Sequence, residues 1–292
     1  MRVLITGKNG YIGNKTADWL RSHEGGFEVD FLDMKDSGWK DKSFNDYDCI
    51  IHAAGIAHVN SNDKDLYDKV NTVLAHECAM KALKDGVRHF VFISSVYVYG
   101  AENGLSKKNI IDENTPEKPA TFYGESKLNA EKLIAGLRSD AFTVSILRIP
   151  MVYGPGCKGN YVRLSKLSKK IFLFPKLDNQ RSMIFVDNLT EFLRLLLINP
   201  SNGVFYPQNR EYVNTSKLVY EIAKCNNKKV AFTGIFNPLI KLMSKGHGKI
   251  AGLINKLFGN YMIDGKLSAF YADYNICDFE TSVKLSEGKE TN

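Results

Sequence analysis

Short apolar runs alternate with longer, helix-like segments along the first half of the chain. Runs of strand length lie at residues 2–6, 27–32, 47–51, 89–94 and 142–149. Between them, residues 11–21, 65–85 and 122–137 repeat their apolar positions every three or four residues, as helices do. Strands that alternate with helices predict an α/β fold with a doubly wound parallel sheet and right-handed crossovers.

The pattern loosens after Pro150. Residues 152–156 are expected to form a turn, residues 163–170 and 215–225 helices, and Val230 to lie in a short strand. A helix at 186–198 and a strand at 203–206 are expected to rejoin the sheet. We therefore predict a main domain of residues 1–153 and 184–207, and a small discontinuous α/β lobe of residues 154–183 and 208–292.

Residues 236–258 combine apolar positions with lysines. One interpretation is a helix that lies on a membrane surface. The interpretation we prefer is a helical region that packs on the core of the lobe, because Gly246, Gly248 and Gly252 interrupt the pattern.

Composition narrows the class of protein. The 292 residues are 44% hydrophobic and 24% charged, which is typical of a soluble globular protein. No apolar run approaches the roughly 20 residues of a membrane span, and a strand beginning at residue 2 leaves no room for a signal peptide. Five scattered cysteines favour neither disulfides nor a metal site, and fit a cytoplasmic protein. The net charge of +7 is spread along the chain, so an anionic small substrate explains it better than a nucleic acid.

Glycines follow the first strand in the order Gly7-x-x-Gly10-x-x-Gly13, and a helix begins within them. Strand, glycine loop and helix in this order are the context of a dinucleotide-binding loop. The glycines allow a tight turn, a close approach to a pyrophosphate, and close packing of the helix on the strand, and the helix N-terminus favours negative charge. The alternative is a glycine-rich turn without a ligand.

Asp33 ends the second strand, 26 positions after Gly7 (33 − 7). An acidic residue about 20 residues after the loop accepts hydrogen bonds from the adenosine ribose. A carboxylate there repels a 2′-phosphate, which favours NAD, while the nearby Lys35 keeps NADP as an alternative. Asp33 could instead simply begin the next loop.

Small residues follow the third strand, as His52-Ala53-Ala54-Gly55. Side chains of this size let a flat ring or a sugar lie against the backbone, so we assign Ala53, Ala54 and Gly55 to cofactor binding. His52 is interpreted as a structural turn residue rather than a catalyst.

Tyr123 and Lys127 lie at positions i and i+4 of a predicted helix and therefore share one face. A nearby ammonium favours the phenolate, so we expect Lys127 to lower the pKa of Tyr123 and also to hold a ribose. Ser95 ends the fourth strand and can donate a hydrogen bond to a substrate oxygen. Together the three residues predict a proton-transfer site beside a hydride carrier.

These motifs resemble the extended short-chain dehydrogenase/reductases of the NAD-dependent epimerase/dehydratase group, which act on nucleotide sugars. The resemblance rests on motifs in the order of that family, over about two thirds of the chain: Thr6-Gly-Lys-Asn-Gly-Tyr-Ile-Gly13, His52-Ala-Ala-Gly55, Asn71, Ile93-Ser-Ser-Val-Tyr-Val-Tyr-Gly100, Tyr123-Gly-Glu-Ser-Lys127, Arg148 with Val152-Tyr-Gly-Pro155, and Arg181 ahead of Phe185-Val-Asp187.

The resemblance implies a Rossmann domain and a role for each matching residue. Ser95, Tyr123 and Lys127 would be catalytic, with Ser95 and Tyr123 also contacting the substrate. Asn160 and Arg181 would hold the diphosphate of a UDP-sugar, and no metal is implied. The implied cofactor contacts are Gly7, Asn9, Gly10, Tyr11, Ile12, Gly13, Asp33, Ala53, Ala54, Gly55, Asn71, Ser94 and Lys127. Members of the family are often homodimers, and the helices at about 66–85 and 122–137 are the candidates for the interface.

Departures from the family pattern reduce the number of reactions that fit this sequence. Met151 stands where the family usually has Asn, and Ser95-Val-Tyr97 replaces the Thr-acid-acid triplet of 4,6-dehydratases. Residues 159–170 and 179–182 look most like bacterial capsule and O-antigen enzymes that reduce the C4 ketone of UDP-4-keto-6-deoxy-N-acetylhexosamines. With the short lobe, this favours a reductase. The alternatives are a UDP-glucose or UDP-N-acetylglucosamine 4-epimerase with tightly bound NAD, and a non-catalytic dinucleotide sensor.

Overall fold

The protein is described here from a computed structural model that covers residues 1–57, 63–100, 105, 109–246 and 248–289. Its contacts divide the chain into two compact units. Unit 1 consists of residues 1–101, 116–149 and 189–207, and unit 2 of residues 102–115, 150–188 and 208–292. Both units are assembled from separate stretches of chain, so neither corresponds to a single continuous segment.

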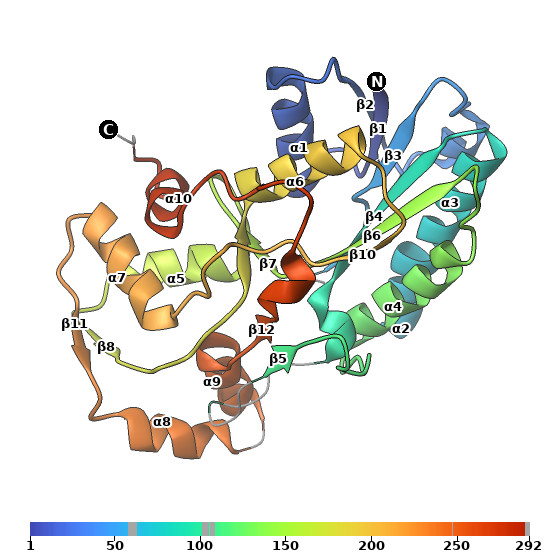
Figure 1. The fold of residues 1–292 in the computed structure, drawn as a ribbon. Coiled ribbons are helices and arrows are strands. Elements are labelled where there is room, and N and C mark those ends of the chain that lie inside the picture. Colours follow the sequence, from blue (N-terminus) through green and yellow to red (C-terminus); the bar gives the residue numbers. More distant parts are fainter. Residues whose placement is uncertain (58–62, 101–104, 106–108, 247, 290–292) are drawn as a thin grey trace. The chain divides into compact units, whose positions relative to one another are not determined.

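Unit 1 contains a six-stranded parallel sheet (Figure 1). Its spatial order is β10 (Gly203–Phe205), β6 (Thr143–Ile149), β4 (His89–Ser95), β3 (Cys49–His52), β1 (Arg2–Thr6) and β2 (Glu28–Leu32). Each of these strands contains β-branched or aromatic residues, which favour the strand conformation. β3 is also buried along its whole length. This confirms the predicted α/β fold with a parallel, doubly wound sheet.

The strand order reverses beside β1. From β1 the chain first adds β2 on one side and then β3 on the other, where Thr6 pairs with His52. In sheets of this kind, ligands bind outside the carboxyl ends of the strands at such a reversal. The residues that follow β1 and β3 are Gly7 and Ala53-Ala54-Gly55, so the fold brings two of the predicted cofactor segments together.

Helices cover both faces of this sheet. Helix α1 (Tyr11–Ser22) and helix α6 (Val186–Ile198) lie on one face (Figure 1), where the indole of Trp19 donates a 2.9 Å hydrogen bond to Glu191. The other face is covered by α2 (Lys64–Tyr67), the π-helical segment η2 (Asp68–Val73), α3 (Leu74–Lys84) and α4 (Phe122–Ala135). Short 3₁₀ turns, η1 (Ser37–Asp41) and η3 (Val96–Tyr99), complete the unit.

The core of unit 1 lies between the sheet and the α3–α4 layer. Small side chains of α3 pack there against large apolar side chains of the strands, including Phe90, Phe92, Phe142 and Ile50, all fully buried. Alanines and Cys78 on α3 let the helix approach the sheet closely. This packing fixes α4, which carries the candidate catalytic residues.

Unit 2 contains three small parallel strand pairs. These are β5 (Ile110–Ile111) with β12 (Met262–Ile263), β7 (Met151–Tyr153) with β9 (Met183–Phe185), and β8 (Leu173–Pro175) with β11 (Ala231–Thr233). Its helices are α5 (Asn160–Ser168), α7 (Thr215–Cys225), α8 (Asn237–Ser244), α9 (Lys249–Phe258), η4 (Gly265–Ser268) and α10 (Phe279–Ser286). The lobe predicted from the sequence comprises residues 154–183 and 208–292; unit 2 also includes residues 102–115, 150–153 and 184–188.

Three elements differ from the sequence prediction. The expected turn after Pro150 begins with strand β7, because Met151–Tyr153 pair with β9. The residues after β2, to which no element was assigned from the sequence, contain the 3₁₀ turn η1, which buries Trp39. The segment at 236–258 forms two helices rather than one, since Gly246 and Gly248 fall between α8 and α9.

Candidate active site

The glycine loop after β1 is held close to the end of β3. Gly7 has φ +86°, and a Cβ atom there would lie 2.9 Å from the Cα of Ala54. The Gly7 amide donates to the carbonyl of Leu32 at 3.1 Å, which also fixes the loop to the end of β2. Only glycine combines this conformation with this approach, so the tight turn expected of Gly7 is present.

The first turn of α1 has neither a side-chain cap nor an acidic residue that would compete with a ligand for its amide groups. The residue at the cap position is Gly10. A Cβ on Gly13 would lie 3.1 Å from Ile5 of β1, so Gly13 lets the helix pack close to the strand. Asn9 is exposed, and Tyr11 and Ile12 are half-buried. Free amides at a helix N-terminus suit a diphosphate.

Asp33 lies directly after β2, next to the carbonyl that holds Gly7. Its carboxylate is half-buried and accepts a 3.0 Å hydrogen bond from the backbone of Lys35, which keeps it at the strand end. This is the position expected of a ribose-binding acid. Its selection of NAD remains a prediction.

Asn71 holds the chain after β3 in place. Its amide nitrogen donates to Ile56 O and to Ser126 Oγ, both at 3.0 Å, and its oxygen accepts from the Ile56 amide at 2.9 Å. The side chain is fully buried and lies in the π-helical segment η2. Such segments are frequent at functional sites. Asn71 thus joins the cofactor segment at Gly55 to the catalytic helix α4 through Ser126.

His52 is a core residue. It is fully buried, and its Nδ1 lies 3.1 Å from Thr6 Oγ1. Burial and the nearby charge of Lys127 lower the pKa of His52 to about 3, so the imidazole is neutral at physiological pH. Thr6 Oγ1 also accepts from the Ala54 amide at 3.3 Å. His52 therefore braces β1 against β3, in agreement with the structural role expected for it.

Ser95 and Tyr123 lie together because α4 begins directly against η3. Thr121 caps the helix, accepting a 3.1 Å hydrogen bond from the Gly124 amide. A Cβ on Gly124 would collide with the carbonyl of Tyr97, so only glycine permits this approach. Tyr123, one residue earlier, is hydrogen-bonded to the Ser95 side chain. The two residues predicted to share a substrate oxygen are therefore neighbours.

The expected effect of Lys127 on Tyr123 is wrong in this structure. Burial raises the pKa of Tyr123, and the hydrogen bond with Ser95 offsets this only in part. The Lys127 ammonium instead donates to the carbonyl of Ile93 at 2.9 Å and lies 4.6 Å from the centre of the Phe92 ring. The i, i+4 spacing places both residues on one face of the helix, but it does not fix where the flexible lysine ends.

Lys127 nevertheless ends at the cofactor segment. A Cβ on Gly55 would lie 3.3 Å from the Lys127 nitrogen and 3.0 Å from the Asn71 oxygen. Burial lowers the pKa of Lys127 to about 8, although Glu131 acts in the opposite direction. Gly55 therefore leaves room for the side chains of Lys127 and Asn71, and an amine with a pKa near neutrality beside this segment suits both ribose binding and proton transfer.

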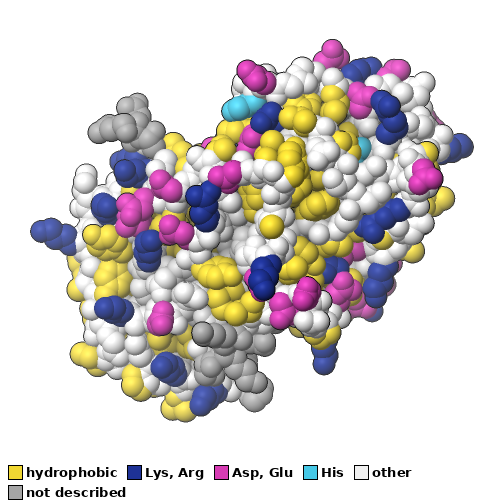
Figure 2. Space-filling view, viewed as in Figure 1, with side chains coloured by type: hydrophobic (Ala, Val, Ile, Leu, Met, Phe, Trp, Pro, Cys, Tyr) yellow, Lys and Arg dark blue, Asp and Glu magenta, His cyan; other side chains and the backbone are white. Residues whose placement is uncertain are grey.

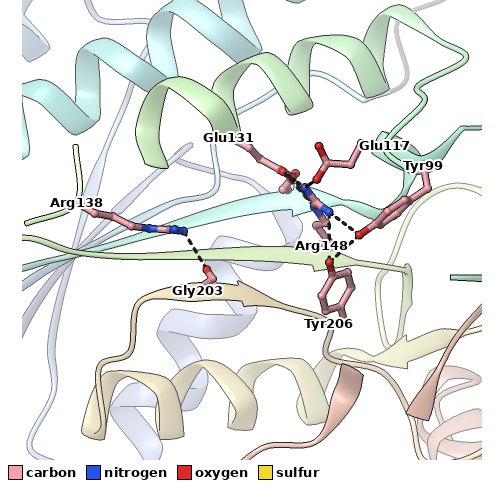
Figure 3. Close-up of polar contacts among 8 residues, drawn as sticks. Tyr99, Glu117, Glu131, Arg138, Arg148, Gly203 and Tyr206 are labelled. Carbon is pink, nitrogen blue, oxygen red and sulfur yellow. Dashed lines mark hydrogen bonds and ion pairs between the residues drawn. The ribbon is translucent and has the colours of Figure 1, made fainter. Parts of the chain in front are cut away.

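A buried ion pair beside the candidate catalytic residues was not predicted from the sequence. Arg148 on β6 donates to both carboxylate oxygens of Glu131 on α4, with Nε–Oε1 at 3.2 Å and Nη2–Oε2 at 2.6 Å. Figure 3 shows the guanidinium between the two glutamates, Glu131 and Glu117, and the hydroxyl groups of Tyr99 and Tyr206. Ser94 donates its hydroxyl to Glu131, and its predicted contact with the cofactor stays a prediction. The available signal was the position of Glu131, one turn after Lys127 on the buried face of α4.

The two predicted diphosphate-binding residues lie in unit 2. Asn160 is exposed at the start of α5. Arg181 is nearly buried; its backbone pairs with Val213, and its guanidinium donates to the carbonyl of Lys256. Part of the Arg181 side chain is therefore already engaged within its own unit. Its contact with a substrate stays a prediction, as does that of Asn160.

Comparison with known proteins decides the family. A family model described as the NAD dependent epimerase/dehydratase family matches residues 3–208. The chain belongs to this family. The match extends from β1 through β10 and includes the glycine loop, Ser95, Tyr123 and Lys127. It confirms the resemblance recognised in the sequence and makes the chain an enzyme of an NAD-dependent family.

Individual relatives agree with this family. A UDP-glucose 4-epimerase from Vibrio cholerae is 28% identical over 288 residues, covering 90% of this chain and 87% of its own. An N-acetyl-alpha-D-glucosaminyl-diphospho-ditrans,octacis-undecaprenol 4-epimerase from Escherichia coli O157:H7 is 28% identical over 256 residues, covering 81% and 76%. The crystal structure of a UDP-glucuronic acid 4-epimerase from Bacillus cereus, in complex with NAD, superposes with a TM-score of 0.75 at 18% identity, covering 99% and 98%. The last likeness supports the fold.

Proposed function

We propose that this protein is a sugar 4-epimerase that inverts C4 of UDP-glucose or UDP-N-acetylglucosamine with tightly held NAD. The observation that carries the proposal is the hydrogen-bonded pair of Ser95 and Tyr123 beside Lys127 and the glycine loop. The same groups serve a reductase, which the sequence analysis preferred. The relatives described above are 4-epimerases by name, and they shift the preference to the epimerase.

The residues of unit 1 fit NAD at three places. The amides at the start of α1 suit its diphosphate, Asp33 its adenosine ribose, and Gly55 with Lys127 its second ribose. When bound, NAD would supply the hydride acceptor and donor for C4. Asp33 favours NAD over NADP, because its carboxylate repels a 2′-phosphate.

The chain's own part in the reaction is proton transfer and orientation. As the phenolate, Tyr123 would accept the proton of the C4 hydroxyl during oxidation at C4, and would return it during reduction on the opposite face of the sugar. Ser95 orients the C4 oxygen by a hydrogen bond, and its hydrogen bond with Tyr123 favours the tyrosinate. Substrate and product are isomers, so no net oxidant is consumed.

The deciding experiment measures nucleotide content and cofactor dependence. We expect near-stoichiometric NAD in the denatured, freshly purified protein, and interconversion of UDP-N-acetylglucosamine and its C4 epimer without added cofactor. Tyr123→Phe should lower kcat by about 10²- to 10⁴-fold, as the loss of a general acid–base does, while leaving bound NAD unchanged. An empty protein that consumes NAD(P)H with a UDP-4-keto-6-deoxy-N-acetylhexosamine would instead establish the reductase, which Met151 and the short lobe favour.

The carrier of the sugar is a separate question. The name of the E. coli relative gives an N-acetylglucosaminyl group on a polyprenyl diphosphate. The assay should therefore compare the sugar on UDP with the same sugar on a polyprenyl diphosphate in detergent. If kcat/KM is at least ten-fold higher for the lipid-linked sugar, the substrate is the sugar on a polyprenyl diphosphate rather than on UDP. The proposed chemistry at C4 stays the same.

We also propose that the protein is a homodimer formed through α3 and α4. Apolar side chains are exposed on both helices: Met80 is 51% exposed and Leu133 44%. Val73, at the end of η2, and Leu83 add to this surface. Helices of these two segments are the interface expected from the family resemblance.

A further inference from the structure

The strongest unexplained feature of unit 2 is an apolar surface around α8 and α9. We define it by its most exposed side chains: Phe172 (85%), Ile235 (82%), Leu242 (68%), Ile250 (63%), Leu253 (59%) and Leu239 (57%). Single exposed apolar residues are ordinary, but a contiguous group of them marks a binding surface. The packing expected for residues 236–258 therefore holds for only one side of each helix.

The four elements of this surface are held together. β8 pairs with β11, and Phe174 of β8 lies 5.6 Å, centre to centre, from the Phe258 ring of α9. The side chain of Asn237 at the start of α8 donates to the carbonyl of Lys176 at 2.7 Å, and Asn255 of α9 donates to the carbonyl of Ser244 at 3.2 Å. The exposed residues therefore belong to one folded module rather than to loose loops.

Each helix has its exposed apolar side opposite its buried side. At about 100° per residue, Leu239, Leu242 and Met243 of α8 lie on one side, and the more buried Ile240 and Ser244 on another. Lys241 and Lys245 lie between these two sides.

The same division recurs in α9. Ile250 and Leu253 are exposed, Ala251 and Phe258 are buried on the opposite side, and Lys256 flanks the exposed group. An exposed apolar side bordered by lysines is the pattern of a helix that lies in a membrane interface.

The charge of the segment that contains α8 and α9 indicates which kind of partner binds this surface. Between Glu221 and Asp264 the sequence contains seven lysines and no acidic residue. Along the edge where Figure 1 draws α8, Figure 2 shows hydrophobic side chains next to basic ones. Apolar side chains suit acyl chains, and lysines beside them suit anionic headgroups. Within the described residues, no helix is both long and apolar enough to cross a bilayer.

We infer that α8 and α9, together with Phe172 and Ile235, bind the surface of an anionic lipid bilayer. The apolar side chains insert at the level of the headgroups, and Lys241, Lys245 and Lys256 contact lipid phosphates. This inference goes beyond the proposed reaction and does not depend on it, because membrane binding is measured without turnover.

The test is sedimentation of the full chain with lipid vesicles. The protein should bind vesicles of phosphatidylglycerol and phosphatidylcholine in equal parts at least ten-fold more strongly than vesicles of phosphatidylcholine alone. Leu242→Ser and Leu253→Ser should each weaken this binding by about ten-fold, since each removes a side chain buried in the interface. Ile276→Ser is the matched control, because Ile276 is 51% exposed in the same unit but outside the surface.

A second pair of variants tests the charge. Lys241→Gln with Lys245→Gln should weaken binding by at least ten-fold, because each lysine near an anionic surface contributes about five-fold. Lys284→Gln with Lys289→Gln removes the same charge elsewhere in unit 2 and should leave binding unchanged. The substituted leucines and lysines are exposed, so every variant should keep the melting temperature of the parent.

Three results would overturn the inference. Equal binding to both kinds of vesicle would remove the role of the lysines. Unchanged binding of the two leucine variants would remove the role of α8 and α9. A lipid-free oligomer that Leu242→Ser or Leu253→Ser dissociates, observed by sedimentation velocity, would assign the surface to a second copy of the chain.

Discussion

Lys127 and Glu131 lie one turn apart on the buried side of α4, and the charge of one affects the proton affinity of the other. Burial lowers the pKa of Lys127 to about 8, and the Glu131 carboxylate limits that decrease. Glu131 is itself fixed by Arg148 and Ser94. A residue that contacts neither substrate nor cofactor can therefore set the pH range in which the lysine carries its charge.

Replacing Glu131 should move the alkaline limit of activity. The proposed reaction requires Lys127 in its charged form. Because Lys127 loses its proton as the pH rises through about 8, kcat/KM of the parent should fall there. In Glu131→Gln the ammonium loses a nearby negative charge, so its pKa falls and the alkaline limb moves to lower pH. The pH profile of kcat/KM measures this.

Glu125→Gln is the control, since Glu125 lies on the same helix but forms an exposed ion pair with Lys64. Its profile should match that of the parent. A Glu131→Gln profile that stays in place, or moves to higher pH, would contradict the positioning role. The variant should also lose about 3–5 kcal/mol of stability, because Arg148 keeps its charge but loses a buried partner; denaturant unfolding measures this loss.

His52 should make the protein less stable in acid. Its pKa is about 3 in the folded protein, against an ordinary 6.5 in the unfolded chain. Below pH 6.5 the unfolded state binds the extra proton, so the contribution to stability falls as the pH drops from 6.5 towards 3. The slope is at most about 1.4 kcal/mol per pH unit.

Comparing the pH dependence of unfolding of the parent and of His52→Asn gives the contribution of His52 to stability. The free energy of unfolding of His52→Asn should fall less steeply between pH 6.5 and 4 than that of the parent, whatever its value at pH 7. Chemical denaturation at several pH values gives both slopes. Parallel curves would show that His52 accepts a proton within the folded core.

At the level of elements, the sequence predicted the sheet and its cofactor edge better than anything else. β1, β3, β4 and β6 are short runs rich in apolar residues, which is the pattern of a buried parallel strand. The glycine spacing then identified the turn between β1 and α1. Ser95 and Gly55 could be placed because they lie at the carboxyl ends of β4 and β3, and the carboxyl ends of parallel strands meet at one edge.

The features that could not be predicted from the sequence depend on contacts between residues that are distant along the chain. Strands such as β5 and β12 contain two residues each and exist only because they pair with each other, so neither has a local signal. The direction of the Lys127 side chain follows from the position of the Ile93 carbonyl on β4, and the raised pKa of Tyr123 follows from its burial. Likewise, the partner of Glu131 lies 17 positions away on β6.

The turn between β1 and α1 offers a matched pair of substitutions. Gly7 and Gly86 have nearly the same backbone conformation, with φ +86° and +81°, but a Cβ at Gly86 would meet no atom within 4 Å. Gly86→Ala should cost about 1–2 kcal/mol of stability, from backbone strain alone. Gly7→Ala should cost more, because its Cβ would also collide with the backbone of Ala54, and it should weaken NAD binding.

Denaturant unfolding and NAD titration of the two variants separate these effects. Gly86→Ala should bind NAD as the parent does. Equal losses of stability with unchanged NAD affinity in both variants would contradict the close contact between the glycine loop and the end of β3.

For the whole molecule, the dimer proposal is the most direct to test. We expect a dimer at micromolar concentration by sedimentation velocity, and a monomer for Met80→Glu, since a charge would then be buried in the interface. Ile198→Glu is the control, because Ile198 is 50% exposed at the end of α6, a helix on the opposite face of the sheet. A parent that sediments as a monomer would remove α3 and α4 as an interface.

The interleaving of the two units has a consequence for how the chain is made. Unit 1 contains residues 189–207 as well as the first 101 residues, so β10 joins the edge of the sheet only after much of unit 2 has been synthesised. A nascent chain that has just emerged as far as β6 carries the Ser95–Tyr123–Lys127 site on a sheet with an unpaired edge. Ribosome-bound chains halted before residue 203 should therefore recruit chaperones, and chains halted well beyond residue 207 should resist a protease at β6.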